Sequence, residues 1–347
     1  MALWTQVIDP ATLTGYARAS LEAYEQRKGT LAAWLPNRTV ADIVVRFVKG
    51  STGLVDAAKF RAYDAEPEIG TRPSGKRVTL ELPAVSQDIP VSEYEQLRQR
   101  SGAVSDAEAL VTIQNTTDAV VQAVSDAVER LRGIVLATGK ATISQDNFQQ
   151  EDDFGRPAAH QLVATGAFWA DKNVSRLDYL QLLSDVYTDT TGETPGSLVM
   201  SLRVFRAMAA GSEFQTQLVN GGARQPTQAE VNAIVTGAGL PEITLYNRRV
   251  SYNGTRTNVL PDDTLLMLPT PVAPDDFAGT DLGATFWGRT LTSTDADWGI
   301  ADLDRPGIVT GVWKNDRPPM GLQVLSDAIA LPVLANADRS LAAKVLA

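Results

Sequence analysis

The feature that most constrains the fold is an extended polar segment, residues 53–91, followed by one long helix. The segment has strand-like stretches at 60–63 and 78–82, with turn-forming glycines and prolines between them. Neither face carries enough apolar residues to bury itself, and a two-stranded hairpin alone is marginally stable in water. We therefore expect this segment to act as an arm that contacts another chain, as in assembly proteins.

The long helix is predicted over residues 105–138. Ser105 and Glu108 form a capping box at its start, and Gly139 supplies its C-terminal stop. Apolar residues recur at three- and four-residue steps and form one stripe: Leu110, Ile113, Val120, Val121, Val124, Ala127, Val128, Leu131 and Val135. Because this stripe is not a clean heptad repeat, we expect a spine that lies across a sheet rather than a coiled coil. Gly133 is a candidate site for a bend in this helix.

Composition narrows the function classes. A chain of 347 residues is large enough for roughly two domains or one elaborated domain. Its net charge of −10 and pI near 4.8 argue against a surface that grips nucleic acid, which would be basic. The absence of cysteine excludes disulfides, thiol catalysis and thiolate metal sites. The N-terminal residues do not resemble a signal peptide, and no apolar run reaches the ~20 residues that cross a bilayer. We expect a soluble protein made in a cytoplasm.

The remaining elements alternate between helices and strands. Asp9 and Pro10 favour a helix start, and the N-terminal segment fits a mobile tail and an ordinary surface helix equally well. An apolar strand is predicted at 43–48. In the second half the patterns predict helices at 175–187 and 202–210, a helix starting at 226–230, strands at 198–200, 242–246 and 265–268, a hairpin at 253–254, and strand character over 308–346. The predicted class is α+β, with the second half inserted as a compact domain.

No catalytic arrangement emerges from the residues. The sequence has no nucleophile elbow that could form a catalytic triad with the sole histidine, His160. It also has no second histidine that could bind a metal ion together with His160, so a structural role is expected. Residues 153–155 match three letters of a kinase magnesium motif whose other parts are absent. The acidic groups at 151–153 and 262–263 show no ligand spacing and are expected to be solvated loops. The sequence predicts no catalytic residue, no metal site and no cofactor.

The order of these features resembles that of tailed-phage major capsid proteins, specifically the lambda-type protein E family of the Hong Kong 97 capsid fold. The matching stretches are FRAYDAEPEIG, KRVTLELPAVSQDIPVSEYE, AVERLRGIVLATGKATI, DFGRP, TPGSLVMSLRVFRAM and LPVLANADRSLAAKVL. No single stretch is diagnostic, because the signal lies in their order and spacing over nearly the whole chain.

The resemblance implies a division of the chain. It places an N-terminal arm and first strand at 1–52, the extension loop at 53–91 and a peripheral domain at 92–171 that contains the spine helix. An axial domain follows at 172–284, and 285–347 returns to the peripheral domain. The family has no catalytic residues that could be assigned to positions in this sequence.

The resemblance also implies a shell. Hexamers and pentamers would close into an icosahedral virion head around double-stranded DNA, assembled in the host bacterial cytoplasm with portal and scaffolding proteins and, in some relatives, a decoration protein. An acidic interior would avoid gripping the packed DNA. The extension loop would lie over a neighbouring subunit, where its basic residues are candidate contacts: Lys59, Arg61, Arg72, Lys76 and Arg77. Lys76 is also a candidate donor for a covalent cross-link, by position only.

Two alternatives remain open at the level of sequence. An encapsulin-like compartment shell shares the fold and would be told apart by a neighbouring cargo gene. An acidic binding module or hydrolase, a different class, would instead be a monomer or dimer with a concave pocket.

Overall fold

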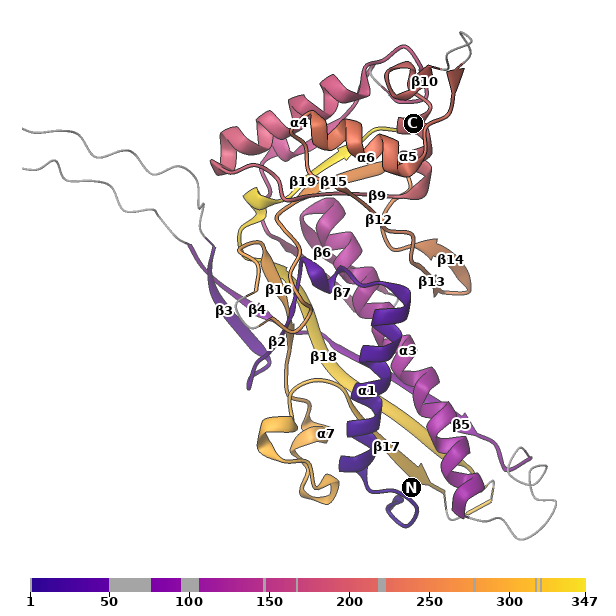
Figure 1. Ribbon diagram of the computed structural model, residues 1–347. Helices are drawn as coiled ribbons and strands as arrows, with labels where there is room; N and C mark the ends of the chain where they lie inside the picture. Colours follow the sequence, from indigo (N-terminus) through magenta and orange to yellow (C-terminus); the bar gives the residue numbers. More distant parts are fainter. Residues whose placement is uncertain are drawn as a thin grey trace, which may run out of the picture.

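The structure, a computed structural model, describes residues 2–49, 76–94, 106–145, 148–166, 168–217, 223–276, 279–315, 317–318 and 320–347. Helices and strands are mixed, as the sequence predicts for an α+β protein. Two sheets organise the chain: a six-stranded sheet backed by two long helices, and a five-stranded sheet covered by three shorter helices (Figure 1). Among the described helices, none combines the length and the apolar content needed to cross a membrane.

The six-stranded sheet has the order β1-β17-β18-β16-β2, and β5 pairs with β18 off this path. Its strands are β1 (Ala2–Leu3), β2 (Asn37–Thr39), β5 (Ala84–Val91), β16 (Gly283–Trp287), β17 (Val309–Lys314) and β18 (Leu322–Leu334). The first nine residues of β18 alternate between buried and half-buried, and the last four are all buried. This long strand is therefore the backbone of the sheet.

Two helices run along this sheet, α3 (Asp106–Thr138) and α1 (Pro10–Lys28) (Figure 1). Val120, Val121 and Val124 in the apolar stripe of α3 are almost completely buried, and α3 packs on β18. The prediction of a spine across a sheet is thus confirmed. Gly139, with a φ of 73°, ends the helix as predicted, whereas Ser105 lies outside the described residues.

The N-terminal segment is an ordinary packed helix rather than a tail. The Asp9 side chain accepts a hydrogen bond from the Thr12 amide at 2.9 Å, as expected for an N-cap. Further along α1, Tyr16 and Ser20 donate hydrogen bonds to Asp118 of α3. These contacts fix α1 against the spine helix.

The five-stranded sheet has the order β12-β9-β15-β19-β8. Its strands are β8 (Gln161–Val163), β9 (Ser197–Met200), β12 (Ile243–Leu245), β15 (Thr264–Leu268) and β19 (Leu341–Lys344), and its helices are α4 (Arg176–Thr191), α5 (Leu202–Ala209) and α6 (Gln228–Gly237). On β15, Leu265 and Met267 face the helices, while Leu266 and Leu268 join the cluster on the other side. The sheet is buried on both faces, which explains the uninterrupted apolar run of β15.

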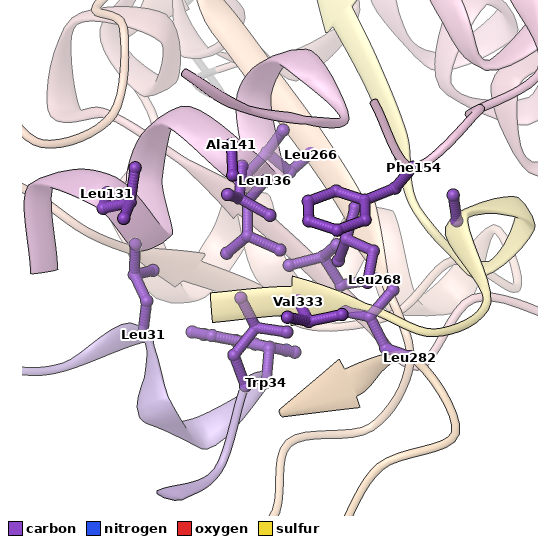
Figure 2. Close-up of a cluster of buried hydrophobic side chains, with 14 of the residues drawn as sticks. Leu31, Trp34, Leu131, Leu136, Ala141, Phe154, Leu266, Leu268, Leu282 and Val333 are labelled. Carbon is purple, nitrogen blue, oxygen red and sulfur yellow. The ribbon is translucent and has the colours of Figure 1, made fainter. Parts of the chain in front are cut away.

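The cluster that contains Leu266 and Leu268, the joining cluster, connects the two sheets. Figure 2 shows Leu266 and Leu268 from the five-stranded sheet packing with Val333 from β18, Leu136 from α3 and Trp34 from the N-terminal region. One hydrophobic core therefore connects segments that lie far apart in sequence.

Small hairpins and short helices complete the fold. The hairpins pair β3 (Val44–Lys49) with β4 (Lys76–Glu81), β6 (Lys140–Gln145) with β7 (Phe148–Asp153), β10 (Thr216–Gln217) with β11 (Ala223–Arg224), and β13 (Arg249–Tyr252) with β14 (Thr255–Asn258). The short helices are α7 (Leu291–Thr294) and the 3-10 turns η1 (Leu31–Ala33), η2 (Ala158–His160), η3 (Ser212–Phe214), η4 (Ala296–Trp298), η5 (Asp302–Asp304) and η6 (Ala337–Arg339).

The structure differs from the predicted extension loop in the C-terminal part of the loop, residues 76–91. β4 pairs with β3, residue for residue from Val44–Glu81 to Lys49–Lys76, while residues 60–63 lie outside the described residues. Residues 84–91, assigned by sequence to the extension, pair as β5 with β18 along their whole length. Val85 and Ile89 are half-buried and Val91 is buried, whereas residues 86–88 between them are exposed and polar. The apolar residues of β5 therefore lie against the protein.

The C-terminal return is divided between the two sheets. β17 and β18 lie in the six-stranded sheet, whereas β19 lies between β15 and β8 in the five-stranded sheet. The turn η6 separates β18 from β19. Leu341 and Ala343 pack toward the helices and Ala342 toward the joining cluster, so a strand this apolar suits an interior position.

Gly133 is explained by a close approach of two segments, not by a bend. A Cβ atom built on Gly133 would overlap the backbone carbonyl of Val259, in the segment between β14 and β15. Gly15 of α1, in contrast, has open space around it. The glycine lets the segment that joins β14 to β15 pass directly against the spine helix.

We therefore expect Gly133→Ala to destabilise the chain by about 1–3 kcal/mol, because overpacking outweighs the gain of about 1 kcal/mol in helix propensity. The matched control Gly15→Ala should be neutral or stabilising, because alanine has the higher helix propensity and meets no neighbouring atoms there. Urea unfolding of the unassembled chain measures both free energies. Equal effects of the two substitutions would contradict the close approach.

Candidate assembly surfaces

The structure places two of the five sequence-predicted contact residues. Lys76 and Arg77 are the first two residues of β4, at register positions opposite Lys49 and Val48 of β3. Lys59, Arg61 and Arg72 lie outside the described residues, so the structure does not bring the five together. The β3–β4 pair forms the base from which residues 50–75 depart and to which they return.

A second candidate surface lies in the loop between β16 and β17, and the sequence did not reveal it. Leu291 of α7 is 90% exposed and Leu303 of η5 is 95% exposed. Underneath, Trp298 and Ile300 are buried in a small cluster, and the Arg289 side chain donates to the Asp302 carbonyl at 3.2 Å. The loop is thus anchored while two leucines face outward. An isolated leucine in a polar loop gives no periodic signal, which is why the pattern missed it.

A third candidate surface is a groove between α3 and the edge strand β5. It consists of adjoining hollows of about 510, 80 and 350 Å³. The first shares Val85 and Ala127 with the second, and Ala119 with the third. Within the described part of the chain, β5 pairs only with β18, which leaves its other edge open. An open edge is a template for a further strand.

A buried polar centre beneath these surfaces holds α1, α3 and the first strands together. Glu129 of α3 accepts hydrogen bonds from the Leu31 amide at 2.6 Å, from Thr30 at 3.0 Å and from Arg132 at 2.8 Å. Arg132 is fully buried and also pairs with Glu25 of α1 at 3.2 Å. Bonds from Arg132 to Asn37 and Thr285 extend the centre to β2 and β16.

The same centre reaches the connection that leaves the five-stranded sheet. Tyr246, directly after β12, donates its hydroxyl to Glu129. Arg248 donates to the Gly29 carbonyl at 3.0 Å and to Ser125 and Asp126 of α3 at 3.0 and 2.8 Å. The orientation of the two sheets is therefore fixed by hydrogen bonds as well as by the joining cluster.

Burial and neighbouring charges shift the pKa values of these groups in different directions. Burial raises the pKa of the Glu25 carboxyl, although Arg132 opposes the shift. Burial followed by the charge of Glu129 raises the pKa of the Tyr246 phenol far above its usual range, so it stays a donor. Burial disfavours the charge on Arg132, but Glu129 and Glu25 more than compensate and raise the pKa of its guanidinium.

His160 and the acidic groups at 151–153 and 262–263 have contacts that suit structural roles. His160 is fully buried with its Nδ1 3.2 Å from the Ser340 carbonyl oxygen, and burial lowers the pKa of its imidazole. Lys140 pairs with Glu151 and Asp153, and Lys344 pairs with Asp263. Across the described residues, no group of three histidines or carboxylates is placed to hold a metal ion.

We expect Glu129→Gln to destabilise the chain by about 3–5 kcal/mol, because it removes a charge that a fully buried arginine requires. The control Glu151→Gln breaks an exposed pair with Lys140 and should cost at most about 1 kcal/mol. Urea unfolding of the unassembled chain compares the two. A similar small loss of stability in both variants would mean that the buried polar centre contributes little to the free energy of unfolding.

Comparison with solved structures shows the fold. A protein described as the capsid protein of an E. coli CFT073 prophage aligns with a TM-score of 0.62 and 15% identity, covering 97% of this chain and 99% of that one. A phage-related protein from Bordetella bronchiseptica RB50 aligns with a TM-score of 0.61 and 14% identity, covering 99% and 98%. The capsid of Myoviridae phage XM1 aligns with a TM-score of 0.51 and 11% identity, covering 91% and 90%.

These likenesses show the Hong Kong 97-type capsid fold. No curated protein matches the sequence. The profile of the family described as phage major capsid protein E, however, matches residues 21–345, nearly the whole chain. The chain therefore belongs to the phage major capsid protein E family, whose members form capsid shells.

Proposed function

We propose that this chain forms hexamers and pentamers that close into an icosahedral phage head around double-stranded DNA. The observation that carries the proposal is the family match over residues 21–345. The role is structural rather than enzymatic, which agrees with the buried setting of His160 and the ion-paired carboxylates of Glu151 and Asp263. The virion is its final location, after assembly in the host bacterial cytoplasm with portal and scaffolding proteins, and a decoration protein is a further candidate partner.

The fold supports a set of contacts between copies. The extension that departs from β3 and returns at β4 lies over a neighbouring subunit, where Lys59, Arg61, Arg72, Lys76 and Arg77 pair with acidic residues. Each exposed pair contributes about 0–1 kcal/mol, so these pairs set register, and repetition over many copies supplies strength. The axial part, about 172–284, meets its copies around the capsomer axis.

The exposed leucines add an apolar contribution to these contacts. Burying one leucine side chain stabilises by about 1.5–3 kcal/mol, and Leu291 and Leu303 are almost fully exposed in the single chain. The family match supports a second copy of the chain as the partner that covers them. The same match favours a phage head over an encapsulin-like compartment and over an acidic binding module or hydrolase.

Negative-stain electron microscopy of the purified chain, expressed alone and with its neighbouring genes, tests the proposal. Closed shells or capsomer rings are expected in at least one condition. A uniform monomer in both conditions would overturn the proposed function.

The leucine surface has its own test in the double substitution Leu291→Ser and Leu303→Ser. We expect the free energy of unfolding of the single chain to change by less than about 0.5 kcal/mol, because both side chains are exposed. The yield of shells should fall at least tenfold, because each contact loses apolar burial.

The matched control keeps the apolar area by replacing both leucines with methionine, and it should assemble like the unmodified chain. Light scattering gives the yield of particles, and microscopy gives their form. Normal assembly of the serine variant would remove this loop from the interface.

A further inference from the structure

The β13–β14 hairpin carries a positive charge that contrasts with the rest of the chain. Residues 247–260 contain three arginines and no acidic residue, whereas the whole chain has a net charge of −10. Arg248 is buried and bonded to Asp126, so it belongs to the polar centre. Arg249 and Arg256 are exposed, and within the described part of the chain neither has a carboxylate partner. The hairpin therefore presents two uncompensated cations to solvent.

The register of the hairpin places these cations on one face. Arg249 lies opposite Asn258 and Ser251 lies opposite Arg256, so these four side chains point to the same side. Val250 on the other side is buried in the joining cluster. Arg249 and Arg256 are diagonal neighbours, about 7–8 Å apart at the backbone. Arg249 Nε donates to Asn258 Oδ1 at 2.7 Å, which leaves its terminal nitrogens to contact a ligand.

The hairpin is held firmly against the spine helix. The Arg130 guanidinium lies over the Tyr252 ring, 3.9 Å from its centroid, and the Tyr252 hydroxyl donates to the Ser144 carbonyl at 3.3 Å. The two-residue turn has Asn253 and Gly254 at φ values of 49° and 73°, the combination that favours a tight hairpin. The exposed face is thus preorganised and not a flexible loop.

The chemistry of this face fits phosphate better than a protein surface. Its side chains are two arginines, a serine and an asparagine, all hydrogen-bond donors, and the exposed turn beside it adds Asn253, Gly254 and Thr255. Arginine, serine and asparagine are typical contacts to nucleic-acid phosphates. Protein–protein hot spots are enriched in tryptophan and tyrosine as well as in arginine. This face carries no aromatic side chain.

We propose that the Arg249–Arg256 face of the β13–β14 hairpin contacts the phosphate backbone of the DNA enclosed by the shell. This inference rests on the proposed function, and it places the hairpin on the inner side of the shell. The contact does not depend on the DNA sequence. It is sparse, because each acidic subunit contributes one hairpin. The DNA is thereby touched at regular points while the acidic remainder of the surface repels it.

The test measures binding of a short fluorescein-labelled DNA duplex to the full-length chain, kept below its assembly concentration, by fluorescence anisotropy over a series of salt concentrations. Each phosphate contact changes the slope of log K against log salt by about one. We expect Arg249→Gln with Arg256→Gln to reduce this slope by about two and to weaken binding about 10- to 100-fold near 0.1 M salt.

Two controls isolate the geometry from net charge. Arg203→Gln with Arg206→Gln removes the same charge from exposed positions on α5 and should leave the slope unchanged. Arg249→Lys with Arg256→Lys keeps the charge and should keep most of the binding. No detectable binding by the unmodified chain, or equal losses in the two glutamine variants, would overturn the inference.

Electron microscopy of each variant separates this inference from the proposed function. Normal shells with weakened DNA binding support both. If the Arg249 and Arg256 glutamine variant no longer forms shells while its DNA binding is unchanged, the hairpin is a contact between copies and the inference is wrong. If the unmodified chain forms no shells, the proposed function fails whatever the binding data show.

Discussion

The arrangement of the two sheets depends on one buried arginine. Arg132 is inside the protein, where an unpaired charge is costly, so Glu129 and Glu25 must lie beside it. Those two carboxylates bring α1 and α3 together, and Glu129 also binds Thr30 and Tyr246. Apolar packing alone would tolerate small shifts between these segments. A buried ion pair with directional hydrogen bonds does not, and this fixes the subunit shape that neighbouring copies must match.

A rigid body of this kind suits a shell made of weak, repeated contacts. The candidate surfaces for assembly are an open strand edge on β5, a hairpin base at β3–β4 and two exposed leucines in an anchored loop. None of them is large by itself. Their geometry is preserved because each is attached to the sheets or the spine helix, so small energies per contact add over many copies.

Local patterns in the sequence predicted the individual elements well. The spine helix ends at Thr138 as its apolar steps and Gly139 indicate, and the Asn253–Gly254 turn forms the predicted hairpin. Pairing between distant strands was harder. β5 was taken as part of the extension because its exposed polar residues resemble an arm, and β18, its partner, lies more than 200 residues away. Gly133 was interpreted as a bend because its neighbour Val259 lies more than 100 residues away in the sequence.

The sequence by itself determined the α+β class, the spine helix, the family resemblance and the absence of cysteine chemistry, because periodicity, capping and composition are local properties. Only the tertiary structure decided that β19 crosses into the five-stranded sheet, that Glu129 and Tyr246 meet around Arg132, and that Leu291 and Leu303 remain uncovered. Burial and pairing depend on which distant segments come together, and a side chain's identity does not reveal its neighbours. Leu291 and Leu303 could therefore be recognised as candidate contacts only once the core that leaves them exposed was known.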